Sequence, residues 1–415
     1  MSGEKTPFAW AILAGCCALT FGMGTMLNTG GQWFVSVTQE LGVGTAQLAL
    51  YFTVQGLCMA AAAPFVGKFL PKLNTKVLLT VCYVLCLAAV GMMSQYHAVW
   101  QWYISGAVLG LAGAFCFIIP APVILGNWFV KKTGFVVGIA MSFSGIGGAI
   151  ANPVIAALIP AIGWRTTYIV IAVATAICVL PFTLLILRFK PADMGLKPYG
   201  YEETPAGATA APATAAAMSG VTSKRALRSA AFWILFVVGG GFAFTGGITQ
   251  LLPTYATSMN LLAIVGLIST VCMVGNVIGK LGLGAISDKL GGVPTGVIGM
   301  VIIAVGFVLL LLFGTSAPLV LVGSTLLGCS LSLTAVVAPI LARTAFGSKE
   351  FPAIYANLNI GLSLIGAFGT TIMGLLFDVT GSFDAVFMIY IGLCALLIVL
   401  IILALNLAKR LPREA

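Results

Sequence analysis

Residues 260–291 read NLLAIVGLISTVCMVGNVIGKLGLGAISDKLG. Up to Gly284 this stretch is apolar, and it is long enough to cross a bilayer, which takes roughly 20 helical residues. Asn276 and Lys280 are its strongly polar residues away from the ends. The segment that follows, residues 284–291, is predicted to form a cytoplasmic turn. The stretch therefore predicts a membrane-spanning helix that carries a cation.

Lys280 is the first candidate for a functional residue. It precedes Asp288 by eight residues, which is ~12 Å along a helix and places it near the middle of the hydrocarbon layer. A lysine at that depth costs about 2.5–3.5 kcal/mol on insertion scales, so a functional role is the first hypothesis. The alternative is that its side chain extends to the cytoplasmic headgroups, although four carbons would cover part of the distance only.

The composition excludes a soluble protein. Of the 415 residues, 60% are hydrophobic and 7% are charged, which is too little charge to cover the surface of a soluble domain. A net charge of +10 could suggest a nucleic-acid partner, but the cations lie between apolar runs. That distribution is typical of membrane proteins, so we expect the lipid bilayer as a partner and no nucleic acid. The ten cysteines lie in apolar runs, with no CxxC pair and one histidine. A disulfide framework, a metal site or another cofactor is therefore not expected.

Twelve apolar runs predict an all-α polytopic membrane protein with two bundles of six helices. The linker at residues 189–229 separates a bundle at 1–188 from a bundle at 230–415. It contains an Ala-, Pro- and Thr-rich run at 205–217, which cannot build a core and predicts a mobile connector. The expected spans are 8–37, 45–67, 76–95, 100–128, 134–160, 165–188, 231–257, 261–284, 294–314, 318–343, 352–377 and 384–408.

The lysines and arginines predict the orientation. Eighteen of the twenty fall at the termini, in the linker or in loops on one side of the predicted membrane. The exceptions are Arg165, at the start of the sixth span, and Lys280. Because cations concentrate on the cytoplasmic side, both termini and the linker are expected there, with the protein in the cell (inner) membrane.

The motif formed by Gly284, Asp288, Lys289 and Gly291 resembles the loop signature of the major facilitator superfamily. Four further segments resemble the bacterial oxalate/formate antiporter and monocarboxylate transporter branch of that superfamily. The resemblance spans nearly the whole chain and implies two six-helix bundles and transport by alternating access. The four segments are NWFVKKTG (127–134), GWR (163–165), KPADMGLKP (190–198) and LRSAAFW (227–233).

Polar residues inside the spans are candidates for substrate binding, because the first, fourth, seventh and tenth helices line the central cavity in this superfamily. For serine and threonine the alternative is a hydrogen bond back to their own helix. Asparagine and glutamine are harder to satisfy in that way. A glycine run at 239–241, with Gly246 and Gly247 after it, could loosen the seventh helix or form a packing surface. The binding candidates are Lys280, Asn28, Gln32, Tyr51, Gln55, Thr249, Asn276 and Asn359.

The resemblance also bears on the substrate. Carriers of this branch place a cation, usually arginine, where Lys280 stands, and dicarboxylate carriers have a second cation where this chain has Leu362. Proton-coupled carriers often have an aspartate in the place of Asn276. We therefore expect a monomeric antiporter or uniporter for a small organic anion, specifically a monocarboxylate.

Two alternatives remain from the sequence. A proton-driven exporter of drugs or hydrophobic compounds is disfavoured, because the spans hold no central carboxylate: Glu40, Asp378 and Asp384 fall near outer ends. A transporter-like membrane sensor remains open. An enzyme is disfavoured, since there is no carboxylate pair, no HExxH motif and no second histidine.

Overall fold

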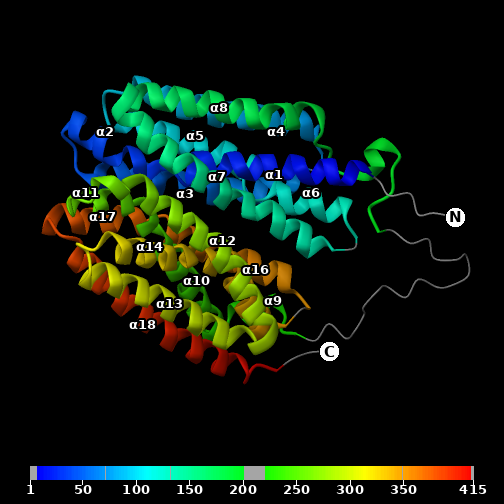
Figure 1. The fold of residues 1–415 in the computed structure, drawn as a ribbon. Coiled ribbons are helices and arrows are strands. Elements are labelled where there is room, and N and C mark those ends of the chain that lie inside the picture. Colours follow the sequence, from blue (N-terminus) through cyan, green and yellow to red (C-terminus); the bar gives the residue numbers. More distant parts are fainter. Residues whose placement is uncertain (1–6, 71, 131, 201–219, 348, 413–415) are drawn as a thin grey trace, which may run out of the picture. The chain divides into compact units, whose positions relative to one another are not determined.

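The computed structural model describes residues 7–70, 72–130, 132–200, 220–347 and 349–412. In this part of the chain, twelve helical segments are long and apolar enough to cross a membrane, which confirms the predicted number of spans. Figure 1 traces them in chain order from blue to red. The longest is Phe8–Leu41 and the most apolar is Phe383–Ala408.

Several spans consist of more than one helix. Through the sixth span the helices are α1 (Pro7–Leu27), η1 (Gly30–Trp33), α2 (Phe34–Leu41), α3 (Thr45–Phe69), α4 (Thr75–Met92), α5 (Trp100–Cys116), α6 (Pro120–Trp128), α7 (Thr133–Ile162) and α8 (Trp164–Leu185). From the linker onward they are α9 (Ser223–Leu227), α10 (Ala230–Gly246), η4 (Gly247–Gln250), α11 (Leu252–Ser258), α12 (Val265–Leu290), α13 (Gly292–Leu312), α14 (Ala317–Ser332), η6 (Leu333–Val337), α15 (Ala338–Phe346), α16 (Phe351–Gly366), α17 (Gly369–Thr380) and α18 (Phe383–Ala408).

The chain divides into two compact units. The first holds residues 1–43 and 54–208, and the second holds residues 44–53 and 209–415. The first turns of α3 thus cluster with the second unit, and the carboxylate of Asp378 explains why. Its Oδ1 accepts the backbone N–H of Thr45 at 3.0 Å, and its Oδ2 accepts that of Ala46 at 2.8 Å. A carboxylate at a helix N-terminus satisfies free N–H groups and matches the helix dipole.

Breaks recur at corresponding places in the two halves. The first span breaks into α1, η1 and α2, and the seventh breaks into α10, η4 and α11. The fourth span restarts at Pro120, and the tenth restarts with Pro339 in the first turn of α15, after the π-helix η6. A proline lacks the N–H that a continuing helix needs, so it fits the start of the second piece. The matching breaks indicate an internal repeat.

The glycines at 239–241 in the seventh span are closely packed, as the packing alternative predicted. Gly239–Gly241 lie inside α10 and are buried. A Cβ on Gly241 would come within 2.6 Å of Leu397, and one on Gly239 would collide with Leu362. The helix instead changes to η4 at Gly247.

Close helix pairs in both units depend on glycine. A Cβ on Gly24 of α1 would collide with the carbonyl oxygen of Ser144 in α7. In the second unit, Gly275 of α12 would collide in the same way with Thr325 of α14. Small residues let helix backbones approach closely, which is the main route to tight packing between helices in lipid.

The linker was predicted to be mobile from 189 to 229, and this prediction is wrong for its two described ends. Tyr199 donates its N–H to the carbonyl of Trp128 at 2.8 Å and accepts that of Val130 at 3.0 Å. At the other end, Val221 donates to the carbonyl of Phe346 at 2.8 Å. Backbone hydrogen bonds join each end to the C-terminal end of a helix in its own unit, α6 or α15, which composition alone does not reveal. The run at 205–217 lies outside the described residues.

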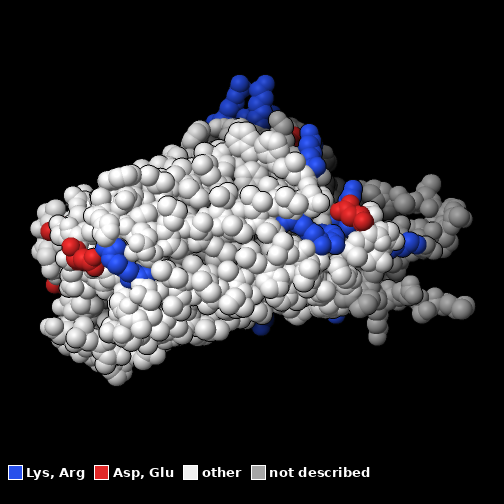
Figure 2. Space-filling model, turned by 90° about the horizontal axis from the view of Figure 1, so that it is seen from above, with Lys and Arg blue, Asp and Glu red and all other residues white. Residues whose placement is uncertain are grey.

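Apolar side chains cover much of the surface. Ile177, Leu185 and Val379 are each more than two-thirds exposed. On the face in Figure 2 most of the surface carries no charge. Such a surface matches lipid tails rather than water.

Candidate functional site

Lys280 lies well inside a helix that is longer than the sequence suggested. Helix α12 continues to Leu290, so ten residues, ~15 Å, separate Lys280 from the end of the helix. The prediction of a turn over 284–291 is therefore wrong for Gly284, Asp288 and Lys289, which lie on the last two helical turns. The chain leaves the helix at Gly291, whose φ of +82° is open to glycine but costly for other residues.

Asn276 lies one turn before Lys280 and is almost completely buried, at 2% exposure. Within the described chain its side-chain oxygen, Oδ1, has no hydrogen-bond partner. Its backbone carbonyl accepts the hydroxyl of Ser332 in α14 at 2.9 Å. Because nearly all buried polar atoms are paired in proteins, this turn of α12 keeps hydrogen-bonding capacity for a ligand or a water molecule. Lys280 itself is half-buried.

Asn28 and Gln32 join the broken first span to α7. The Asn28 side chain donates to the carbonyl of Ser144 at 3.0 Å, and Gln32 donates to Oδ1 of Asn152 at 3.1 Å. Asn152 in turn donates to the carbonyls of Gly148 and Asn28 at 2.7 and 3.3 Å. Sequence reasoning missed Asn152, although an asparagine inside an apolar run was a usable signal. A cavity role for Asn28 and Gln32 stays a prediction.

Thr249 and Asn359 bond to their own helices. The Thr249 hydroxyl donates to the carbonyl of Gly246 at 2.8 Å, as the alternative for threonine predicted. Asn359 donates to the carbonyl of Tyr355 at 3.0 Å, although an asparagine was expected to be harder to satisfy in this way. The structure therefore gives both side chains a local partner.

Tyr51 and Gln55 both lie on α3 and are buried. The boundary between the units falls after Thr53, so Tyr51 belongs to the second unit and Gln55 to the first. Tyr51 packs on Phe52 with ring centroids 4.1 Å apart.

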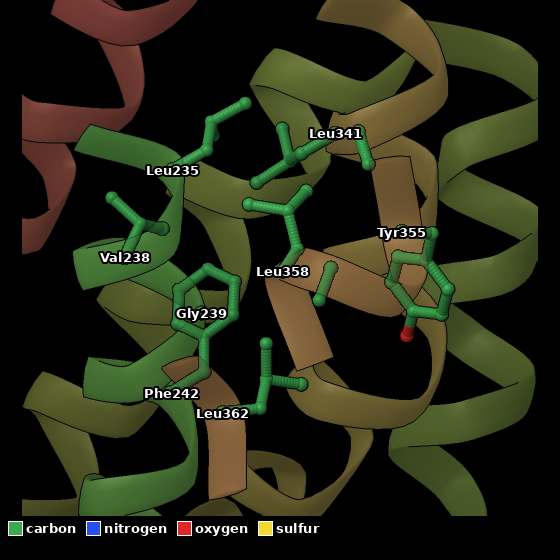
Figure 3. A pocket seen from close by; sticks show the side chains of 10 residues that line it. Leu235, Val238, Gly239, Phe242, Leu341, Tyr355, Leu358 and Leu362 are labelled. Carbon is green, nitrogen blue, oxygen red and sulfur yellow. The ribbon is translucent and has the colours of Figure 1, made fainter. Parts of the chain in front are cut away.

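An apolar hollow in the second unit was not predicted, because its lining residues look like ordinary core. Side chains of α10, α15 and α16 line a small hollow with room for about 10 Å³, roughly one water molecule. Figure 3 shows the α10 and α16 side chains across it, with the hydroxyl of Tyr355 as the single oxygen on the displayed side chains. One of the lining residues is Leu362, which stands where dicarboxylate carriers of the similar branch have a second cation. The lining is Leu235, Val238, Gly239, Phe242, Ala338, Leu341, Ala342, Tyr355, Leu358 and Leu362.

A polar cluster in the first unit lies where the first, third and sixth spans end or begin. The Arg165 guanidinium pairs with Glu40 at 2.7 Å and donates to the carbonyls of Ser94 and Tyr96 at 2.9 Å each. The Trp164 indole donates to the other Glu40 oxygen at 2.5 Å. The cluster ties the ends of three spans together, which is a structural role.

Twelve apolar spans with a repeated pattern of breaks form the architecture that two-bundle membrane transporters share. The chain belongs to the Major Facilitator Superfamily, whose family model matches residues 13–264 and 262–415. Among curated proteins it is 21% identical over 366 residues to "Uncharacterized MFS-type transporter YhjX" of Escherichia coli, covering 85% of each chain.

Shorter matches reach other members of the family. The chain is 26% identical over 165 residues to monocarboxylate transporter 12 of Rattus norvegicus, covering 40% of this chain and 34% of that one. It is 27% identical over 169 residues to a probable sulfoacetate transporter, SauU, of Cupriavidus necator, covering 37% and 35%. The crystal structure of the nucleoside transporter NupG has the same fold, with a TM-score of 0.71 at 14% identity over 96% of this chain and 98% of that chain.

Proposed function

We propose that this protein transports a small organic anion, specifically a monocarboxylate, by alternating access as an antiporter or uniporter. The observation that carries the proposal is the position of Lys280 near the middle of α12. It lies one turn from the buried side-chain oxygen of Asn276, which has no hydrogen-bond partner among the described residues. No other charged residue occurs between residues 261 and 287. An ammonium group binds a carboxylate through charge-assisted hydrogen bonds, which are about twice as strong as neutral ones.

The energetics support an anionic substrate. A lysine at mid-membrane costs about 2.5–3.5 kcal/mol, and a bound carboxylate offsets part of that cost. The names of two relatives, a monocarboxylate transporter and a probable sulfoacetate transporter, also refer to anions. A drug exporter driven by protons would need a carboxylate deep in a span. The described Glu40, Asp378 and Asp384 instead lie within a few residues of helix ends.

We further propose that both termini and the linker are cytoplasmic and that the protein works as a monomer in the cell membrane. The orientation rests on the eighteen cations that share one side of the twelve spans. The monomer follows from the two six-helix bundles that one chain supplies for alternating access.

Substitution of Lys280 tests the function. Lys280→Ala should abolish uptake of labelled monocarboxylate into proteoliposomes while the protein still inserts and purifies. Lys280→Gln should bind poorly, and Lys280→Arg should keep weak binding with altered selectivity, because a planar fork replaces a point charge. Uptake by the alanine variant at the wild-type level, normalised to expression, would refute the proposal. Counterflow of labelled substrate separates a carrier from a sensor, which would bind without exchange.

A further inference from the structure

Ser332 joins α14 to the turn of α12 that carries Lys280. Its hydroxyl donates to the backbone carbonyl of Asn276 at 2.9 Å, across 56 residues of sequence. In an α-helix that carbonyl also accepts the backbone N–H of Lys280, four residues on, and a carbonyl oxygen with two lone pairs can hold both donors. Ser332 is therefore hydrogen-bonded to the same oxygen atom as the backbone of the residue that we propose binds the substrate.

The two helices are in close backbone contact around this bond. They lie side by side (Figure 1), and a Cβ on Gly328 of α14 would collide with the carbonyl of Cys272 in α12. A Cβ on Gly279 of α12 would lie 2.6 Å from the hydroxyl oxygen of Ser332, which is fully buried. Small residues allow such close approach between helices in lipid. The position of the turn over 276–280 therefore depends on α14.

The hydrogen bond of Ser332 differs from the one that serines usually make inside a membrane helix. Ser324, which is equally buried in α14, donates to the carbonyl of Val320 in its own helix at 2.7 Å. That local bond is the common arrangement for serine, whereas Ser332 reaches across to α12. Ser332 is also the last residue of α14 before the π-helix η6, and π-helical turns occur often at functional sites.

We infer, on the basis of the proposed function, that Ser332 is a positioning residue for substrate binding, because it fixes the turn that carries Asn276 and Lys280. It acts through the backbone of α12 and sets the direction in which the two side chains of that turn face. Hydrogen bonds weaken steeply when their angle departs from linear. A looser turn should therefore bind a carboxylate less tightly.

Two substitutions break the bond from opposite sides. Ser332→Ala removes the donor from α14. Gly279→Ala places a methyl group on α12 where the hydroxyl now lies, so the hydroxyl has to turn away from Asn276. Each should raise the KM for uptake about three- to tenfold, equivalent to about 0.6–1.4 kcal/mol, with a smaller change in the maximal rate. That is the size of effect expected when one buried hydrogen bond is lost.

The measurement is uptake into proteoliposomes of labelled formate, acetate or propionate, whichever the wild type takes up fastest. Ser324→Ala is the matched control for α14, since it also removes a buried serine hydroxyl. Gly282→Ala is the control for α12, because no atom lies within 4 Å of its Cβ position. Both controls should keep the wild-type KM. Ser332→Cys retains a weak donor and should fall between wild type and Ser332→Ala.

A double substitution distinguishes positioning from a merely structural role. In the Lys280→Arg background binding is expected to be weak already, so Ser332→Ala should raise the KM by a smaller factor there than in the wild type. Residues that act through one another give such non-additive effects, whereas independent effects add as free energies. Melting temperatures in detergent, measured for every variant, show how much each one destabilises the fold.

The outcomes separate this inference from the function on which it rests. If Lys280→Ala loses uptake but Ser332→Ala and Gly279→Ala keep the KM of their controls, the positioning role is wrong and the function stands. An equal factor for Ser332→Ala in both backgrounds also overturns the inference. If Lys280→Ala takes up substrate normally, or none of the three carboxylates is taken up by the wild type, the proposed function itself fails.

Discussion

Leu362 bears on the valence of the substrate. It belongs to an apolar wall and packs against Gly239, so no cation is available there for a second carboxylate. Leaving a charged group unpaired in such a place costs at least a few kcal/mol. We predict that oxalate and malonate compete for uptake at least about tenfold more weakly than monocarboxylates of similar size. Inhibition constants from proteoliposome uptake measure this, and oxalate as the best competitor would show that the argument from a single cation is wrong.

The hydrogen bonds from Arg165 to backbone carbonyls should contribute more to stability than its ion pair with Glu40. The pair with Glu40 is partly exposed, with 29% and 47% of the two side chains accessible, so it is worth about 0–1 kcal/mol. Arg165→Ala also leaves the carbonyls of Ser94 and Tyr96 without this donor. Glu40→Gln keeps an acceptor for Trp164. We predict a clearly larger drop in melting temperature for Arg165→Ala than for Glu40→Gln in detergent. Equal drops would mean that the ion pair dominates.

Single residues were partly predictable from the sequence. The position of Lys280 inside a long helix followed from the apolar run around it, and the hydrogen bond of Thr249 to its own helix followed from threonine chemistry. Asn152 was missed because a side chain that joins two helices has its partner far along the chain, 120 residues away in the case of Gln32. The apolar hollow was missed for a related reason, since hydrophobic residues look alike in sequence whether they pack in a filled core or line a small cavity.

At the scale of helices, the contact between α12 and α14 leaves no room for a side chain at Gly275. A Cβ there would collide with the backbone carbonyl of Thr325, which cannot swing aside. We predict that Gly275→Ala destabilises the protein by about 1–3 kcal/mol, as overpacking does elsewhere. Gly282, on the same helix, has no atom within 4 Å of its Cβ position, so Gly282→Ala is the control and should be neutral or slightly stabilising. Thermal unfolding in detergent compares them, and equal behaviour would contradict the packing argument.

Asn152 should be the polar residue on which the broken first span depends most. It donates to two carbonyls and accepts from Gln32. We predict that Asn152→Ala lowers stability by about 1–2 kcal/mol, because it removes three hydrogen bonds and leaves buried groups unpaired. Asn357 is an exposed asparagine that donates to the carbonyl of Ala353 on its own helix, which makes Asn357→Ala a control with little expected change. An unaffected melting temperature in Asn152→Ala would show that packing alone holds η1 in place.

The existence of the helices was easier to predict than their breaks. Long apolar runs are sufficient to identify all twelve spans. Proline cannot continue a helix without losing a backbone hydrogen bond, and Pro120 and Pro339 both stand at the start of a new helix. The π-helix at Leu333–Val337 had no local signal, because it depends on how α14 packs on its neighbours.

For the whole molecule, the proposed orientation can be tested by labelling. If the linker is cytoplasmic, as we propose from the cation distribution, a cysteine at position 210 should react with a membrane-impermeant maleimide only after the cells are opened. Thr315→Cys, in the exposed loop between α13 and α14, should react in intact cells. The unsubstituted protein gives the background from Cys178, the exposed native cysteine of the described chain. Labelling of Ala210→Cys in intact cells would show that the linker is outside and that the proposed orientation is wrong.

The carboxylate that caps α3 has a consequence for the order in which the protein is built. Asp378 follows Thr45 by 333 residues, so a ribosome must finish ten spans and most of an eleventh before that carboxylate exists. Until then, the first N–H groups of α3 have no such acceptor and depend on water or headgroups at the membrane surface. The second span can insert early, yet its first turns reach their final contacts only when the chain is nearly complete. Biogenesis of the first half therefore ends late, and a ribosome that stops before residue 378 leaves behind a second helix with a frayed beginning.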